Sequence, residues 1–236
     1  MKKLYEKNEV WFAVLWIIVY CAATIPIRGN MGDESPLMLA ALAAIAAGAT
    51  WFVKANHLEG KYGLDRGPVH PERLWYFVPM IVLATGNLWG GVRMAYSGLS
   101  QLWAVLSMLL IGYVEELLFR GFLFRALLKK DGPVPAILIS ALTFGIGHIV
   151  NLLAGQANLE TVMQVFFAIA WGFIFTLAFY KSGSLWPCII IHGLVDVASK
   201  FSAENQTASM VYVIATIAVA AVYVPWLWRQ QTQLAD

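Results

Sequence analysis

Two adjacent glutamates and an arginine interrupt an apolar stretch in the middle of the chain. Glu115, Glu116 and Arg120 lie within residues 102–128, which have the length and apolarity of a membrane-spanning helix. An ionisable side chain at the centre of a bilayer costs about 2.5–3.5 kcal/mol on insertion scales, so a chain that carries three of them close together has a use for them. Carboxylates in such surroundings are suited to general-base chemistry. The segment is therefore a candidate active site inside a membrane.

The spacing of these side chains predicts two different roles. Glu116 and Arg120 are four residues apart and share a helix face, so an internal ion pair would offset part of the cost of burial. Glu115 is rotated by about 100° from Glu116, and the position four residues after it is Phe119. We therefore expect Glu115 to meet a group from another helix, and Glu116 and Arg120 to fix the helix packing.

Two histidines and an aspartate interrupt later apolar segments. Phe144 and His148 are four residues apart and share a helix face, and so do His192 and Asp196. A lone histidine on an apolar face is more often a hydrogen-bonded core residue than a catalyst. One unpaired glutamate, two histidines and an aspartate on three helices are harder to attribute to packing, so we expect them to form one site.

The surroundings of the four histidines differ. Gly145 and Gly147 lie beside His148, and small residues of this kind let a neighbouring helix approach closely. His57 and His70 fall in the polar stretch between the second and third apolar segments. For those two we expect a solvated surface position rather than a catalytic one.

The apolar segments that must position these residues predict an all-α, polytopic membrane protein. Hydrophobic residues make up 60% of the 236 residues and charged residues 13%, whereas about 25% are charged in a typical soluble domain. Crossing a hydrocarbon core of about 30 Å takes about 20 residues. We expect about eight transmembrane helices in a single domain, residues 1–236, with the active site in the core of the helix bundle. The candidate spans are residues 10–27, 37–53, 74–92, 102–128, 134–153, 161–180, 184–200 and 208–228.

The distribution of lysine and arginine predicts the orientation of these spans. With a cytoplasmic N-terminus, twelve basic residues fall on the cytoplasmic side, and only Arg28, Arg93 and Lys200 fall outside. This is the asymmetry of the positive-inside rule, and it makes both termini cytoplasmic. The cytoplasmic set is Lys2, Lys3, Lys7, Lys54, Lys61, Arg66, Arg73, Arg125, Lys129, Lys130, Lys181 and Arg229.

The three motifs together resemble those of a known family. Glu-Glu-x-x-x-Arg at 115–120, Phe-x-x-x-His at 144–148 and His-x-x-x-Asp at 192–196 are similar, in order and in placement on successive spans, to the motifs of the CPBP family. This family includes the type II CAAX prenyl endopeptidases and bacterial abortive-infection and bacteriocin-immunity proteins. The resemblance covers about residues 100–200. It implies an eight-helix intramembrane endopeptidase of a bacterial or archaeal cell membrane, with a cavity open toward the cytoplasm.

The resemblance also implies a role for each motif residue. Glu115 and His148 would hold and deprotonate the attacking water, and His192 with Asp196 would stabilise the oxyanion. The substrate would be a protein or peptide, prenylated or otherwise membrane-associated, cut near its C-terminus. The residues expected to support the site are Glu116, Arg120 and Phe144.

Asp196 stands where the prenyl endopeptidases usually carry asparagine. Because an ionised aspartate would repel an oxyanion, it must be protonated, orient His192 or bind a metal. Two histidines and a carboxylate are also a known set of zinc ligands, and a zinc ion here would use Glu115, His148 and His192. The chain has no His-Glu-x-x-His motif, and we favour metal-free catalysis without a cofactor.

Two other functions remain open. The chain could be a catalytically idle family member that acts as a bacteriocin-immunity or binding module. It could also be a proton-coupled transporter, because intramembrane Glu and His form proton relays, although the inverted repeats typical of transporters are not visible. The expected partners are membrane lipid and a peptide or protein substrate, lipidated or not. The chain has no basic patch interleaved with aromatic residues, so we expect no nucleic-acid partner.

Overall fold

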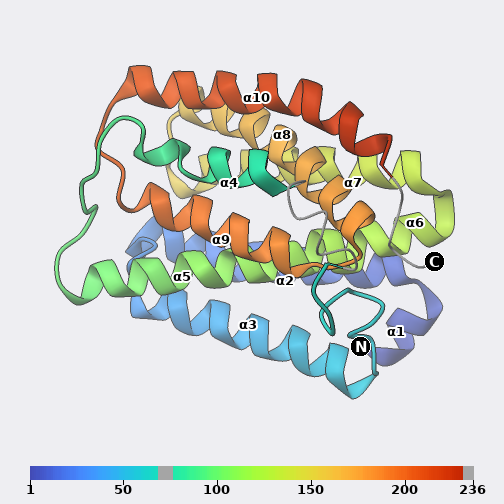
Figure 1. Ribbon diagram of the computed structural model, residues 1–236. Coiled ribbons are helices and arrows are strands. Elements are labelled where there is room, and N and C mark those ends of the chain that lie inside the picture. The colour runs from blue at the N-terminus through green and yellow to red at the C-terminus, as the bar shows by residue number, and fades with distance from the viewer. Residues whose placement is uncertain (69–76, 231–236) are drawn as a thin grey trace.

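The computed structural model describes residues 1–68 and 77–230, and long helices make up most of this part of the chain (Figure 1). Within these described residues, six helices are long and apolar enough to cross a membrane. The chain is therefore a helical integral membrane protein. These six helices are Glu9–Met31 (α2), Pro36–Ala55 (α3), Leu99–Asp131, Pro133–Ala154, Asn158–Ser182 (α8) and Gln206–Trp228 (α10).

Two of the eight expected spans form shorter helices, so the count of eight is not confirmed. The expected span 74–92 gives the apolar segment Val78–Leu88, made of α4 (Val78–Ala84) and the 3-10 turn η2 (Gly86–Leu88); residues 74–76 lie outside the described part. The expected span 184–200 gives α9, Trp186–Ser199. At 1.5 Å per residue these helices are about 17 and 21 Å long, less than the hydrocarbon core.

Both segments that carry the first two motifs change helix type at the motif. The helix Leu99–Asp131 consists of α5 (Leu99–Glu116), the π-helical η3 (Leu117–Phe124) and α6 (Arg125–Asp131). The π-helix begins directly after the glutamate pair. The next long helix is α7 (Pro133–Gly147), which continues as the 3-10 helix η4 (His148–Ala154). Such irregular turns are frequent at functional sites because they redirect side chains.

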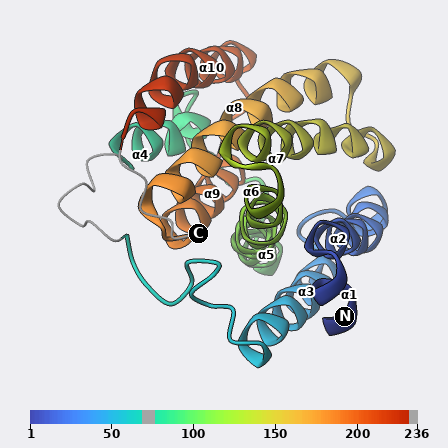
Figure 2. The same ribbon diagram turned by 90° about the vertical axis from the view of Figure 1, so that its right-hand side faces the viewer.

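The helix Leu99–Asp131 runs between two groups of helices (Figure 2). On one side lie α2 and α3, with the short α1 (Lys2–Lys7), and on the other side lie α7 to α10 and α4. α5 contacts α3 and α9, and η3 contacts α2 and α7. The segment with the glutamates therefore faces partners from both groups.

Glycines allow the closest helix crossings near the motifs. A Cβ atom on Gly112 would lie 2.6 Å from the backbone nitrogen of Gly193, which fixes the crossing of α5 and α9. A Cβ atom on Gly145 would lie 2.7 Å from the nitrogen of Ile169, so the close approach predicted at Gly145 is confirmed for α7 and α8. The same prediction for Gly147 is wrong, because nothing lies within 4 Å of the position its Cβ would take.

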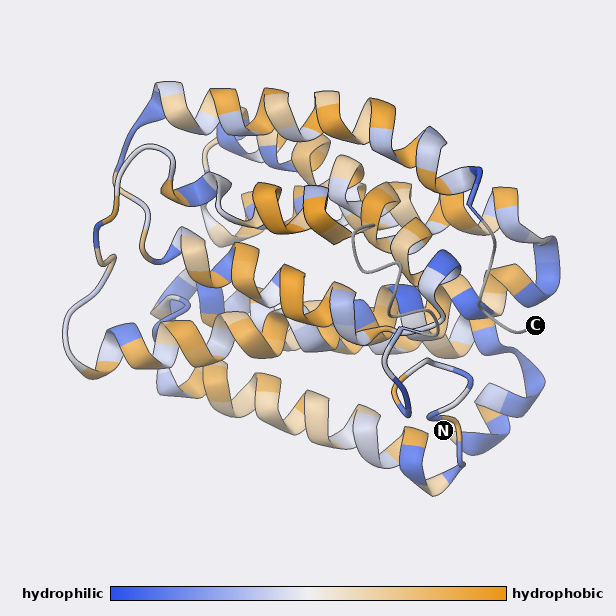
Figure 3. Cartoon of the chain, in the orientation of Figure 1, coloured by the Kyte–Doolittle hydropathy of each residue, from blue (hydrophilic) through white to orange (hydrophobic). Residues whose placement is uncertain are grey.

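The surface of the bundle matches a lipid environment. Apolar residues follow the long helices, and polar residues gather toward their ends (Figure 3). Large apolar side chains such as Trp51 and Val222 are more than 70% exposed. Lipid tails can cover these side chains, whereas in water so many exposed apolar groups would promote association.

Candidate active site

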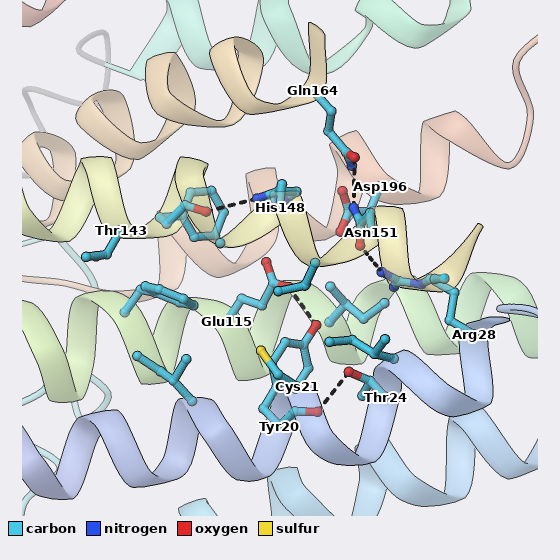
Figure 4. Close-up of a pocket in the computed structure, with 18 of the residues that line it drawn as sticks. Tyr20, Cys21, Thr24, Arg28, Glu115, Thr143, His148, Asn151, Gln164 and Asp196 are labelled. Carbon is cyan, nitrogen blue, oxygen red and sulfur yellow. Dashed lines mark hydrogen bonds between the residues drawn. The ribbon is translucent and has the colours of Figure 1, made fainter. Parts of the chain in front are cut away.

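The four residues predicted to be catalytic line one cavity of about 790 Å³. Glu115 comes from α5, His148 from the start of η4, and His192 and Asp196 from α9. Helix α2 closes the side of the cavity opposite α7 (Figure 4). Three segments that are distant in sequence thus bring their motif residues to one cavity.

Glu115 meets groups from two other helices, as its lack of a partner on its own helix predicts. Its Oε1 accepts a hydrogen bond of 2.6 Å from the hydroxyl of Tyr20 on α2 (Figure 4). Its Oε2 lies 3.7 Å from Nε2 of His192 on α9. Within the described part of the chain, Oε2 makes no hydrogen bond and remains available to a ligand in the cavity.

Glu116 links the arginine of its own helix to the histidine of α9. The predicted ion pair is confirmed, because Nη1 of Arg120 donates to Oε1 of Glu116 over 2.9 Å and both side chains are fully buried. The same Oε1 lies 2.8 Å from Nδ1 of His192. Glu116 therefore does more than lock its own helix, since it also fixes the orientation of the His192 ring.

Aromatic rings enclose the buried guanidinium. Arg120 lies over the rings of Phe144 and Phe175, with its Cζ at 4.1 and 5.4 Å from their centroids. Phe144 in turn packs edge-on against the rings of His148 and His192, at 5.2 and 5.7 Å. Phe144 thus contacts the cation and both histidines, and its supporting role stays a prediction.

The backbone determines which nitrogen of His148 carries a proton in the neutral ring. Nδ1 of His148 lies 2.9 Å from the carbonyl oxygen of Phe144, and a carbonyl oxygen only accepts hydrogen bonds. Nδ1 must therefore donate, so in the neutral ring Nε2 has a free lone pair. His148 lines the cavity, and it can accept a hydrogen bond there.

The carboxylate of Asp196 lies close to the ring of His192. Its Oδ2 is 3.5 Å from Nε2 of His192, one helical turn earlier on α9. Nε2 of this histidine thus faces two carboxylates, Glu115 and Asp196, while Nδ1 is held by Glu116. When both nitrogens are protonated, Nε2 can donate a hydrogen bond into the cavity.

The comparison with known families covers the segment that carries this site. Residues 97–198 match the family model described as type II CAAX prenyl endopeptidase Rce1-like. The motif-bearing segment is Rce1-like. The match includes all three motifs and confirms the resemblance to the CPBP family, which implies a membrane protease, a hydrolase of peptide bonds. Among curated proteins, none matches the chain.

The candidate metal ligands of the Rce1-like segment do not have the arrangement of a metal centre. In residues 1–68 and 77–230, no three His, Cys, Asp or Glu side chains lie close enough together to hold a metal ion. Nδ1 of His148 and Nδ1 of His192 have protein partners, so only the Nε2 atoms of these histidines could bind a metal. The set Glu115, His148 and His192 therefore does not fit zinc in this conformation, and we derive no reaction step through a metal.

One polar face of α2 completes the cavity, and sequence reasoning missed it. Tyr20, Thr24 and Arg28 line the cavity at intervals of four residues. Residues four apart share one face of a helix, so this spacing of polar residues in an apolar segment could have indicated the polar face from the sequence. Arg28 and Lys200, which the charge distribution predicted to lie in outer loops, both line the cavity as well.

Of the other two histidines of the chain, one lies in the described part. His57 is exposed in the turn after α3, in agreement with the expected surface position. His70 lies outside the described residues. His57 does not line the cavity described above.

Proposed function

We propose that this protein is an intramembrane endopeptidase that hydrolyses a peptide bond near the C-terminus of a membrane-associated protein or peptide, prenylated or unprenylated. The observation that carries this proposal is the convergence of Glu115, His148 and His192 on one cavity. The Rce1-like match supports the reaction class. Amide hydrolysis needs a base for water and a hydrogen-bond donor for the developing oxyanion, and these side chains can supply both.

In this mechanism, Glu115 and His148 hold the attacking water. One hydrogen of the water binds Oε2 of Glu115, and the other binds Nε2 of His148. As the water oxygen attacks the scissile carbonyl carbon, Glu115 takes up a proton. Glu115 then delivers that proton to the amide nitrogen while the carbon–nitrogen bond breaks, which leaves a carboxyl group and an amine. The hydrogen bond from Tyr20 keeps the other oxygen of Glu115 occupied, so that Oε2 faces the water.

The oxyanion is stabilised by His192 in its doubly protonated form. Nδ1 donates to Glu116, which leaves the Nε2 proton free to bind the oxyanion. Asp196 acts through His192, since its Oδ2 lies 3.5 Å from the same Nε2 and would repel an oxyanion placed beside it. Glu116 and Arg120 hold the histidine in place from behind the cavity.

The proposed reaction uses no metal ion. Treatment of the purified protein with a strong zinc chelator is expected to leave peptide cleavage unchanged. The control is a known zinc protease in the same detergent and chelator. Loss of cleavage on chelation, followed by recovery with added zinc, would overturn the metal-free mechanism.

We also propose that both termini lie in the cytoplasm. The excess of Lys and Arg at one end of the spans supports this orientation. An epitope tag at the C-terminus is expected to resist added protease in intact cells and to be cut after the cells are opened. Digestion of the tag in intact cells would reverse the orientation.

The decisive experiment measures cleavage of an acylated peptide by the purified protein in lipid vesicles. Glu115→Gln and His148→Ala are each expected to lower kcat by about 100-fold to 10,000-fold, the usual contribution of a general base. The exposed Glu6 provides a matched control, and Glu6→Gln is expected to keep full activity. Unchanged unfolding temperatures would exclude misfolding as the cause.

Two outcomes would contradict the proposal. Activity retained in Glu115→Gln would mean that this carboxylate is not the base. Binding of the peptide without cleavage by the wild-type protein, over a broad set of sequences, would favour the idle binding module instead.

A further inference from the structure

Five lysines gather at the end of the bundle where α1 meets the last turn of α6. Both helices lie at this end, and hydrophilic residues predominate there (Figures 1 and 3). Lys3 and Lys7 on α1 are exposed, and the side chains of Lys129 and Lys130 on α6 are 74% and 69% exposed. Lys61 lies just inside them, with its side chain 22% exposed. We call these five residues the lysine cluster.

A single carboxylate joins two lysines of the cluster from different segments. Glu9, at the start of α2, accepts hydrogen bonds from Nζ of Lys129 over 2.9 Å and from Nζ of Lys61. A second carboxylate, that of Asp131, lies 3.7 Å from Nζ of Lys130. The five lysines therefore face two carboxylates, which leaves three positive charges without a balancing negative charge.

Helix α1 is held against the bundle, so its lysines have a fixed position. The ring of Tyr5 packs edge-on against the rings of Phe12 and Phe52, with the centroids 5.3 and 5.4 Å apart. Lys61 donates a hydrogen bond to the hydroxyl of Tyr5 over 2.8 Å. These contacts fix one face of α1 against α2 and α3, and the exposed lysines lie away from that face.

Lys3 and Lys7 have no anionic partner within the described part of the chain. They are four residues apart and share one face of α1, where like charges repel each other. Glu6, the acidic residue of α1, lies 4.0 Å from Lys2 instead. An anion from outside the protein would relieve the repulsion between Lys3 and Lys7.

The lysine cluster lies at the depth of the lipid headgroups. Trp11, two residues after Glu9, is 62% exposed, and exposed tryptophans gather at membrane–water interfaces. The helix Leu99–Asp131 has 33 residues and is about 50 Å long, so it extends beyond a hydrocarbon core of about 30 Å. Lys129 and Lys130, at the end of this helix, are therefore placed where lipid phosphates lie.

We propose that the lysine cluster binds the headgroups of anionic phospholipids. A phosphatidylcholine headgroup carries its own cation, whereas a phosphatidylglycerol headgroup has a net negative charge that the unbalanced lysines can neutralise. Clusters of four to eight basic residues beside a membrane span attract anionic lipids in this way. The proposal depends on the membrane location of the protein and not on the proposed peptidase function.

The test compares two pyrene-labelled lipids, phosphatidylglycerol and phosphatidylcholine, in vesicles that contain the purified protein in unlabelled phosphatidylcholine. Energy transfer from the tryptophans to pyrene reports how much of each labelled lipid lies against the protein. Wild type is expected to bind phosphatidylglycerol about fivefold or more tightly, since one lysine near an anionic headgroup contributes about that factor. Both leaflets have the same composition, so the result does not depend on orientation.

The triple variant Lys3→Gln/Lys7→Gln/Lys130→Gln is expected to bind the two lipids about equally. It removes three cations and keeps the two that Glu9 holds, so the contacts between α2 and α6 stay intact. The matched variant Lys3→Arg/Lys7→Arg/Lys130→Arg changes the same positions but keeps their charge, and it is expected to keep the wild-type preference. Equal unfolding temperatures of the two triple variants would exclude misfolding as the cause.

Arg93→Gln controls for the net charge of the protein. Arg93 is an exposed cation in the segment before α5, at the other end of the helix Leu99–Asp131, and its loss is expected to leave the lipid preference unchanged. A loss of preference in Arg93→Gln as large as in the triple glutamine variant would overturn the proposal, because net charge alone would then explain the binding.

Three further outcomes would overturn the proposal. These are equal binding of the two lipids by wild type, a preference retained in the triple glutamine variant, and a preference lost in the triple arginine variant. Soluble glycerol phosphate is added as a competitor, and full displacement of the labelled phosphatidylglycerol would assign the cluster to a soluble phosphate instead of a lipid. A wild-type protein that prefers phosphatidylglycerol but cuts no peptide would contradict the peptidase proposal and leave lipid binding in place.

Discussion

At the site, one oxygen of Glu115 and one ring nitrogen of each histidine have a protein partner. Tyr20 occupies one oxygen of Glu115, Glu116 holds Nδ1 of His192, and the carbonyl of Phe144 holds Nδ1 of His148. Within the described part of the chain, Oε2 of Glu115 and Nε2 of each histidine make no hydrogen bond, and all three residues line the cavity. Because some atoms of these side chains are held by protein partners and the others are free, the site is suitable for holding one water and one carbonyl group.

Tyr20→Phe tests the contact that the sequence did not predict. The variant removes the hydrogen bond to Glu115 and is expected to lower kcat by about tenfold, in line with one hydrogen bond to a charged group, with little change in KM. Tyr113→Phe is the matched control, because it also removes a hydroxyl contact between helices, to Thr50, but does not line the cavity. Equal activity of the two variants would exclude a positioning role for Tyr20.

Arg120→Met tests the buried pair behind the site. Loss of the cation leaves Glu116 buried with an uncompensated charge, so the free energy of unfolding is expected to fall by about 3–5 kcal/mol. Adding Glu116→Leu removes that charge and is expected to restore most of the stability. The double variant should remain inactive, because His192 then lacks its Nδ1 acceptor. Stability is measured by unfolding in detergent micelles; an active double variant would contradict the assigned role of Glu116.

The helices bring these groups together through their crossings. α5 and α9 approach so closely at Gly112 and Gly193 that a side chain does not fit between them. This contact lies one turn from the glutamate pair on α5 and directly beside His192 on α9. The register of the two helices therefore determines the distance from Glu116 to His192, and with it the orientation of the histidine.

Gly112→Ala tests that crossing. The added methyl group would lie 2.6 Å from the nitrogen of Gly193, so α5 and α9 must separate. We expect a loss of about 1–3 kcal/mol in the free energy of unfolding, as for other overpacked contacts, and a large loss of activity. Gly147→Ala serves as the stability control, because its methyl group would meet nothing within 4 Å. A fully stable and active Gly112→Ala protein would mean that the helices tolerate a shift.

A salt bridge connects the helix group that contains α2 and α3 to the helix group that contains α9. Asp33, in the connection between α2 and α3, pairs with Lys200, which lies 167 positions further along the chain. Burial raises the pKa of Asp33, but the charges of Arg28 and Lys200 lower it more, so the pKa lies below its ordinary value of 3.8. Ionised Asp33 therefore stabilises the fold at neutral pH, and this contribution is lost as the pH falls through the folded-state pKa.

Asp33→Asn tests this link. At pH 7 the free energy of unfolding is expected to fall by about 1–3 kcal/mol, because two hydrogen bonds to charged groups are lost. The difference from wild type should shrink below about pH 4, where the wild-type carboxylate also begins to lose its charge. Unfolding in micelles from pH 3 to 7 measures both effects. Asp131→Asn, which alters an exposed pair, should show neither; a constant difference at every pH would contradict the assignment.

The membrane character, the position of most helices and the local pairs could be predicted from the sequence. Hydropathy is a property of each segment, and a pair four residues apart, such as Glu116 and Arg120, depends only on helix geometry. The lengths of α4 and α9 could not be read in the same way. Their apolar residues are contiguous with flanking apolar residues, and the packing around them decides where the helix ends.

The sequence by itself therefore determined that this is a helical membrane protein with an Rce1-like set of acid and imidazole groups. Only the tertiary structure decided that Tyr20 binds Glu115, that Glu116 holds His192, and that Arg28 and Lys200 line the same cavity as these residues. The reason is physical: these contacts depend on the rotation and crossing of helices up to 167 positions apart, and no periodicity within one helix encodes them.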